Sequence, residues 1–261
     1  MIILSLALSR FPLATDTRDF HPGLSTITMQ VDFGAGCIWF VAFLFSTTVH
    51  EAMHAFAAWR LGDPTAYEGG QVTLNPAPHV QREPIGMLLL PLFTSLTQGW
   101  AIGWASCPYN PYWAQRYPGR AGVMAAAGPA GNLLVAGAAF AAMKIGLAAG
   151  WFIAPHHVTF ASVIEVQSAS GPMFITSLLS VLLVMNVFLA AFNLLPLPPL
   201  DGSAVLNALL PQRQADQFRD LQANAMMSMM GLLIAWKVFP LVTDPLFSMV
   251  LRVLHPDASY S

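Results

Sequence analysis

Charged residues are scarce in this chain of 261 residues, at 9% of the sequence against about 25% in an ordinary soluble domain. The net charge is only −2, so the basic excess typical of nucleic-acid binding is missing and we expect no nucleic-acid partner. Cysteine is rare too, with Cys37 and Cys107 in unrelated places. This excludes a disulfide framework and a zinc site built from thiolates.

Hydrophobic residues make up 56% of the sequence, and several apolar runs approach the ~20 residues that a helix needs to cross a bilayer. We therefore predict an all-α polytopic membrane protein with about 4–6 membrane helices and the lipid bilayer as its surroundings. The expected spans are residues 33–61, 121–150, 172–195 and 225–239.

Two segments depart from this pattern. Residues 85–105 are apolar but are interrupted by proline and glycine, so they either span the membrane or enter it and return. Residues 66–80 contain a Gly-Gly pair followed by Gln-Val-Thr-Leu, a composition that favours a small β-hairpin. The predicted organisation is an N-terminal arm (1–32), a membrane core (33–202), and a C-terminal part with a loop, the last membrane helix and a tail (203–261).

The first predicted span carries His50, Glu51 and His54 near its end. Ionisable side chains inside a membrane helix are costly, and they are usually functional where they occur. Residues four apart share a helix face, so His50 and His54 can hold one metal ion while Glu51 reaches a metal-bound water. A chance occurrence of this five-residue pattern is the alternative, and the cost of burial argues against it.

A zinc site with two histidines still lacks a third protein ligand. Asp201 stands out, because it follows an apolar helix and a proline-broken segment and so can lie at the edge of the membrane. An aspartate before Gly-Ser-Ala-Val-Leu is equally plausible as a helix N-cap, so both readings stay open on position alone. The other histidines fall in predicted loops and are expected to be ordinary polar residues.

Two motifs together resemble the paired signature of the site-2 proteases, which are intramembrane zinc metallopeptidases. They are HEAMH at residues 50–54 and NLLPLPPLDG at residues 193–202. Further similar pieces are GPAGN at 128–132, LNP at 74–76 and PIGMLLLP at 84–91, the last typical of compact prokaryotic members. The resemblance covers roughly residues 50–202. It implies one zinc ion held by His50, His54 and Asp201, with Glu51 as the catalytic base.

If His54 and Asp201 share one ion, they lie at one depth in the membrane. Both sit near the C-terminal ends of their helices, so these helices run parallel and an odd number of complete crossings separates them. Two apolar runs lie between them, 85–105 and 121–150. The second is longer and unbroken, so we predict that it crosses and that 85–105 is re-entrant or interfacial.

The distribution of basic residues favours a cytoplasmic location for the active-site end. That end would carry Arg60, Arg82, Arg116, Arg120, Arg213 and Arg219. The loop at 151–171 has no lysine or arginine and falls outside, whereas Arg10 and Arg18 in the N-terminal arm count against this orientation. Given the prokaryotic resemblance, we expect an integral protein of a bacterial inner (plasma) membrane.

The resemblance implies a protease whose substrate is itself a transmembrane helix, which must unwind before attack. Asn193 could stabilise the oxyanion or hold the substrate backbone, or it could make a helix–helix hydrogen bond. Asn132 has the same two readings. An edge that includes Gly70, Gln71 and Val72 could bind the unwound strand by β-addition.

Two other classes of function compete with the protease. A non-enzymatic membrane metal-binding or transport protein would be expected to show internal repeats or paired broken helices, which the sequence lacks, and it gives Glu51 no role. An inactive homologue that only binds partners is the third reading, and the intact histidines, glutamate and aspartate speak against it. The oligomeric state cannot be read from the sequence.

Overall fold

The structure is a computed structural model that describes residues 2–3, 32–168 and 171–258. Within these ranges, four helices are long and apolar enough to cross a bilayer: α1 (Phe33–Arg60), α6 (Pro118–Ala148), α7 (Met173–Asn193) and α10 (Ala225–Leu254). The shorter helices are α2 (Thr65–Glu68), α3 (Ala77–Arg82), the π-helix η2 (Ile85–Leu89), α4 (Leu90–Gln98), α5 (Pro111–Arg116), α8 (Asp201–Leu209) and α9 (Gln212–Ala223). The two antiparallel strand pairs are β1 (Ile2–Ile3) with β2 (Gly103–Trp104), and β3 (Phe152–Ile153) with β4 (Glu165–Val166).

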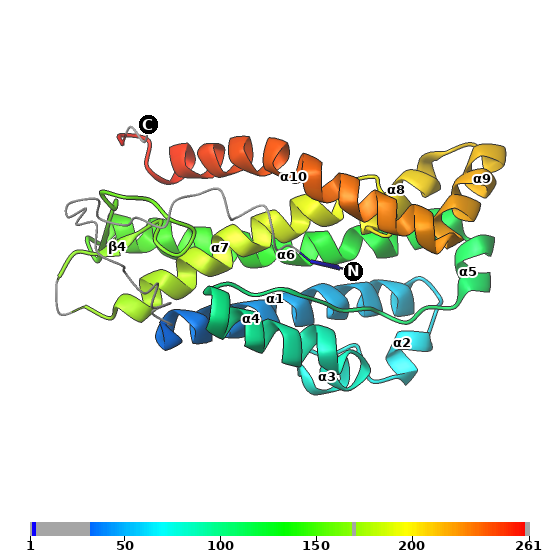
Figure 1. Ribbon diagram of the computed structural model, residues 1–261, viewed down its shortest axis with the longest axis horizontal. Coiled ribbons are helices and arrows are strands. Elements are labelled where there is room, and N and C mark those ends of the chain that lie inside the picture. Colours follow the sequence, from blue (N-terminus) through cyan, green and yellow to red (C-terminus); the bar gives the residue numbers. More distant parts are fainter. Residues whose placement is uncertain (1, 4–31, 169–170, 259–261) are drawn as a thin grey trace, which may run out of the picture.

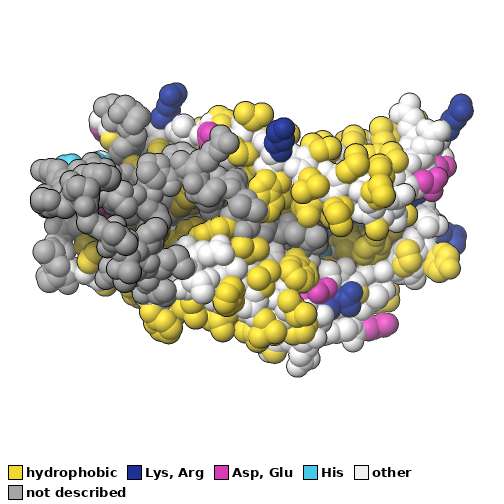
Figure 2. All heavy atoms as spheres, in the orientation of Figure 1, with side chains coloured by type: hydrophobic (Ala, Val, Ile, Leu, Met, Phe, Trp, Pro, Cys, Tyr) yellow, Lys and Arg dark blue, Asp and Glu magenta, His cyan; other side chains and the backbone are white. Residues whose placement is uncertain are grey.

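On the face drawn in Figure 2, hydrophobic side chains cover much of the described surface. Large side chains such as Phe45, Leu134 and Leu233 are exposed on the spanning helices, as expected for helices that face lipid. Charged side chains are few on this face and scattered (Figure 2). The chain is therefore an integral membrane protein built mostly from helices, as its composition predicts.

Helices α1, α6 and α7 pack against one another, and α10 lies beside α7 (Figure 1). Small residues on α6, among them Gly131, Ala136 and Ala139, are buried and allow the close approach typical of membrane helices. The core beside them is aromatic, with edge-to-face contacts joining Phe188 and Phe192 of α7 to Phe239 of α10.

Figure 1 also shows that α1 and α7 run in the same direction while α6 runs in the opposite one. The single complete crossing between α1 and α7 agrees with the odd number of crossings that the sequence predicts. The segment after residue 84 does not cross: η2 has 5 residues and α4 has 9, together about 20 Å of helix against a hydrocarbon core of about 30 Å. The chain then turns at Gly99, whose φ is 75°, and returns through β2.

The predicted β-hairpin at residues 66–80 is wrong in its position. The structure places α2 and α3 there, joined by an irregular loop, and the strand pairs lie elsewhere. Local hydrogen bonds take the place of a ladder: Asn75 Oδ1 accepts from Ala77 N at 3.0 Å, and His79 Nε2 donates to the Thr73 carbonyl at 3.1 Å. Composition alone does not tell these local turns from a strand that needs a partner.

The end of the last span is a second correction. The sequence predicts a stop near residue 239, whereas α10 continues through Pro240 and Pro245 to Leu254. Its far half is held against the bundle, because Leu251 and Leu254 are buried and Lys144 Nζ donates to the Leu254 carbonyl at 3.3 Å. Most of the predicted N-terminal arm (1–32) lies outside the described residues, and the domain boundaries at 32 and 202 stay predictions.

Candidate metal centre

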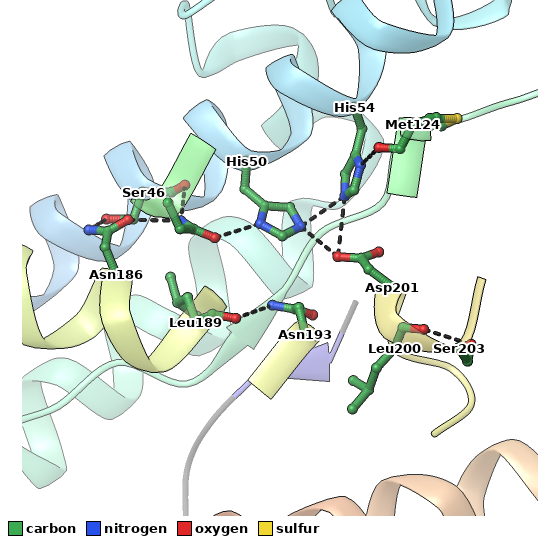
Figure 3. Close-up of polar contacts among 11 residues, drawn as sticks. Ser46, His50, His54, Met124, Asn186, Leu189, Asn193, Leu200, Asp201 and Ser203 are labelled. Carbon is green, nitrogen blue, oxygen red and sulfur yellow. Dashed lines mark hydrogen bonds and ion pairs between the residues drawn. The ribbon is translucent and has the colours of Figure 1, made fainter. Parts of the chain in front are cut away.

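The two histidines of α1 and the first residue of α8 meet at one point (Figure 3). The Nε2 atoms of His50 and His54 are 2.9 Å apart, and Asp201 Oδ2 lies 3.1 Å from the first and 3.4 Å from the second. The three ligand-type atoms all fall within 4.8 Å of one another. Two nitrogens and one carboxylate oxygen converging in this way form a donor set suited to zinc.

Asp201 reaches this point because the chain turns back sharply after α7. Residues 194–200 form the turn, and a β-carbon added at Gly202 would overlap the Leu194 carbonyl, so only glycine permits this closure. Asp201 is the first residue of α8, and its N-cap is Leu200. The N-cap reading of Asp201 is therefore not what the structure shows.

The outer ring nitrogen of each histidine is fixed by a neighbour on α6. His54 Nδ1 donates to the Met124 carbonyl at 2.8 Å, and His50 Nδ1 donates to Asn132 Oδ1 at 2.6 Å. Because both Nδ1 atoms carry the proton, both Nε2 atoms present a lone pair to the common point. Partners of this kind set the tautomer and ring orientation of histidines that bind metals.

The Asn132 amide is itself held in one orientation. Its Nδ2 donates to Asn186 Oδ1 at 2.8 Å and to the Ser46 carbonyl at 3.3 Å, and Asn186 Nδ2 donates to Ser46 Oγ at 2.8 Å. Asn132, Asn186 and Ser46 are all fully buried. This network joins α1, α6 and α7 and directs the Asn132 oxygen toward His50.

Space for an ion is kept by Gly128 of α6. A β-carbon at this residue would lie within 2.5 Å of His50 Nε2 and closer still to His54 Nε2. The backbone of α6 thus approaches the histidine pair as nearly as it can, and any side chain here would fill the space between the nitrogens. The residues present fit a metal ion.

Asp201 contributes the negative charge that such a site needs. Burial by itself raises the pKa of its carboxyl. When the site holds no metal, however, an additional proton on the imidazole pair can face this carboxyl, and its charge and hydrogen bonding outweigh burial and lower the pKa below its ordinary value. The carboxylate is therefore ionised at neutral pH, which is the form that binds a cation.

Glu51 lies beside the histidines in the wall of a cleft of about 480 Å³. Its side chain is buried, and Oε1 has no hydrogen-bond partner in the described part of the chain. A buried carboxylate oxygen without a partner is unusual and marks a functional position. The wall of this cleft includes Glu51, His54, Cys107, Asp201, Asn207 and Arg219.

The sequence profile of peptidase family M50 matches residues 38–237 of the chain. The chain belongs to peptidase family M50. "Putative zinc metalloprotease YwhC" of Bacillus subtilis (strain 168) is 33% identical over 173 residues, which cover 66% of this chain and 68% of that protein. "Putative zinc metalloprotease Rip2" of Mycolicibacterium smegmatis is 30% identical over 172 residues, which cover 66% of this chain and 57% of that protein. No solved structure gives a significant match.

Membership in M50, the site-2 protease family, confirms the resemblance seen in the two motifs, and it makes this chain a zinc metalloprotease of the site-2 type. The family match extends through α8 and α9 and into the first half of α10. The cleft wall formed by α8 and α9 therefore belongs to the part of the chain that the family shares.

The other residues predicted for the M50 site lie at different distances from its centre. Asn193 is buried at the end of α7, where Nδ2 donates to the Leu189 carbonyl at 2.8 Å and Oδ1 has no partner among the described residues. Its bond is thus within one helix and not between helices. Gly70, Gln71 and Val72 are in the loop between α2 and α3 and do not line the cleft.

Sequence reasoning missed Asn186, Ser46 and Gly128 as parts of this site. Asn186 carried a usable signal, because it is a polar residue in the middle of the most apolar span, and the cost argument applied to His50 applies to it equally. Gly128 belongs to the GPAGN motif noted in the sequence, but that motif did not assign it a role, and nothing in the local sequence marks Ser46, since both roles depend on which helix faces them.

Proposed function

We propose that this protein hydrolyses peptide bonds within or near the transmembrane helices of membrane-protein substrates, with one zinc ion held by His50, His54 and Asp201. One observation carries the proposal. Three ligand-type atoms within 4.8 Å of one another share a cleft with Glu51, whose buried Oε1 has no partner among the described residues.

Zinc, when bound, lowers the pKa of a water toward ~7 and polarises a carbonyl oxygen. The chain's own residues do the rest. The Met124 carbonyl and Asn132 hold the two imidazoles with Nε2 deprotonated, and Gly128 leaves the space free. The ionised Asp201 completes the donor set.

Glu51 acts as the general base in this proposal. Its Oε1 accepts the proton of the attacking water and then passes that proton to the nitrogen of the leaving amine. Burial of Glu51 at 1% exposure keeps bulk water from competing for the carboxylate. Because Oε1 makes no other hydrogen bond among the described residues, no existing bond has to break before the transfer.

The substrate reaches this centre from the membrane. The histidines lie on a spanning helix, and the cleft extends from them toward the end of the bundle where α5, α8 and α9 lie (Figure 1). A helical substrate hides its carbonyls in backbone hydrogen bonds, so it must unwind before one of them can enter the cleft. Basic residues at the same end favour the cytoplasmic face of a bacterial inner membrane.

Asn193 remains a predicted catalytic residue that would stabilise the oxyanion or hold the substrate backbone. Its Nδ2 donates to Leu189, so a direct role requires that the side chain rotates or uses the unpartnered Oδ1 to accept from a substrate N–H. Substrate binding at Gly70, Gln71 and Val72 would require this loop to become extended, because the structure has no strand there.

Substitution of Glu51 by glutamine tests the proposal. Purified protein in lipid vesicles should lose cleavage of a single-span test substrate by about 10³-fold or more, yet bind zinc as the wild type does, because the ligands are untouched. Glu68→Gln is the matched control, since Glu68 is exposed at the end of α2. Unchanged turnover in Glu51→Gln would refute the role of Glu51.

A membrane metal-binding or transport protein without enzymatic activity is not favoured. It would have no use for the unpartnered Glu51 oxygen in the cleft, and M50 relatives are named as metalloproteases. Loss of cleavage in Glu51→Gln with intact zinc binding separates the two functions.

A further inference from the structure

The cleft has a second polar group at the end remote from the histidines. Arg219 and Gln222 of α9 and Asn207 of α8 line it together with Asp201. Of the described residues in the wall, Arg219 is the only lysine or arginine. The metal centre accounts for Glu51, His54 and Asp201 but gives Arg219 and its neighbours no function.

This polar group is held close to Asp201 by a hydrogen bond between α8 and α9 and by short spacings along each helix. Ser203 follows Asp201 by two residues on α8, and its Oγ accepts from Gln222 Nε2 at 2.9 Å. Arg219 precedes Gln222 by three residues on α9, so the two side chains share one helix face. α9 is thereby docked on α8 with Arg219 turned into the same cleft as Asp201.

The guanidinium has unused hydrogen-bonding capacity. Its Nη2 pairs with Asp216, one turn earlier on α9, but Nη1 is buried and has no partner in the part of the chain that the structure describes. Asn207 Oδ1, also in the cleft wall, is buried and equally without a partner there. The Arg219 Nη1–H can donate to a carboxylate, and Asn207 Oδ1 can accept from a backbone N–H. Together they suit a ligand that offers both groups.

We infer that Arg219 and Asn207 form a specificity subsite for an acidic residue of the substrate. The inference rests on the proposed protease function and names what flanks its scissile bond. Arg219 is the cationic side chain of the described cleft wall, so a substrate carboxylate is attracted to that end of the cleft. The preferred substrate carries aspartate or glutamate beside its membrane segment, on the side where α1 ends.

The test uses zinc-loaded protein in phosphatidylcholine vesicles, which have no net charge, with a set of single-span test substrates. The membrane segment is constant, and each of the six residues next to it is varied in turn among aspartate, asparagine and lysine. Mass spectrometry gives the cleavage rate of each substrate. At one position, wild-type protein should cleave the aspartate substrate about 10- to 100-fold faster than the asparagine substrate, and the lysine substrate slowest.

The variants assign that preference to a residue. Arg219→Gln should reduce the ratio of aspartate to asparagine cleavage to about one, Arg219→Lys should retain part of it, and Arg219→Glu should favour lysine. Arg213→Gln is the matched control, because Arg213 is exposed on the same helix and does not line the cleft; its ratio should equal that of the wild type.

Two results overturn the inference in distinguishable ways. If wild-type protein cleaves the substrates without preference, or if Arg219→Gln keeps the preference, the subsite is wrong while the protease stands. If zinc-loaded wild-type protein leaves every substrate intact, the proposed function fails and the subsite fails with it. The wild-type ratio needs no variant to fold, so an absent preference overturns the subsite even if a substitution in α9 is damaging.

Discussion

Replacement of Gly128 by alanine should remove zinc binding without unfolding the protein. The added β-carbon would lie within 2.5 Å of His50 Nε2 and nearer to His54 Nε2, whereas ordinary contacts of a β-carbon lie at 3.4–4 Å. Each ring nitrogen must therefore retreat by roughly 1 Å. Zinc–nitrogen bonds are about 2.0–2.1 Å long and tolerate errors of about 0.2 Å, so the required movement is about five times the tolerance.

The expected loss of zinc affinity is about 100-fold or more, equivalent to ~2.8 kcal/mol. Competition with a chromophoric chelator measures the affinity, and thermal unfolding of zinc-free protein reports the fold. Gly137→Ala is the control on the same helix, because nothing lies within 4 Å of a β-carbon at Gly137. It should bind zinc normally and gain about 0.5–1 kcal/mol of stability. A Gly128→Ala variant with wild-type zinc affinity would refute this account of the site.

Two further predictions concern residues around the centre. Asn186→Leu removes the acceptor that orients the Asn132 amide, so zinc affinity should fall about 10- to 100-fold in the same chelator assay; unchanged affinity would remove the network from the site. Cys107 should react slowly with iodoacetamide at pH 8, since burial raises the pKa of its thiol and suppresses the thiolate. Mass spectrometry of a Cys37→Ser variant measures this, and alkylation as fast as that of a free thiol would contradict it.

The sequence alone predicts the spans well and names the three residues whose ligand-type atoms the structure brings together. The spans and the histidine pair depend on strong local rules, whereas Asp201 came from the family resemblance. Four runs of the right length become α1, α6, α7 and α10, and the HEAMH spacing brings two imidazoles to one helix face. The requirement for an odd number of membrane crossings between the two motifs then predicts a long-range feature: α1 and α7 run parallel, and residues 85–98 do not cross. The three ligand-type atoms meet as that argument requires.

The errors share a different physical origin. A Gly-Gly pair with β-prone neighbours forms a strand only if a partner strand is available, and residues 66–80 have local hydrogen bonds in its place. Proline ends a helix in water, but inside an apolar environment a broken helix leaves backbone groups unpaired, so α10 continues through Pro240 and Pro245. Asn186 acts through residues of other helices, and such contacts have no periodicity in the sequence.

Met124, Gly128 and Asn132 lie at intervals of four along α6, so a single stripe of this helix supplies the acceptor for His54, the empty space, and the acceptor for His50. A rotation of α6 by one residue, about 100°, would withdraw all three at once. During membrane insertion, α1 alone therefore carries two unsupported histidines, and high-affinity zinc uptake must await the docking of α6. The proposed hydrolytic centre is thus complete only when α6 and α8 have both packed against α1.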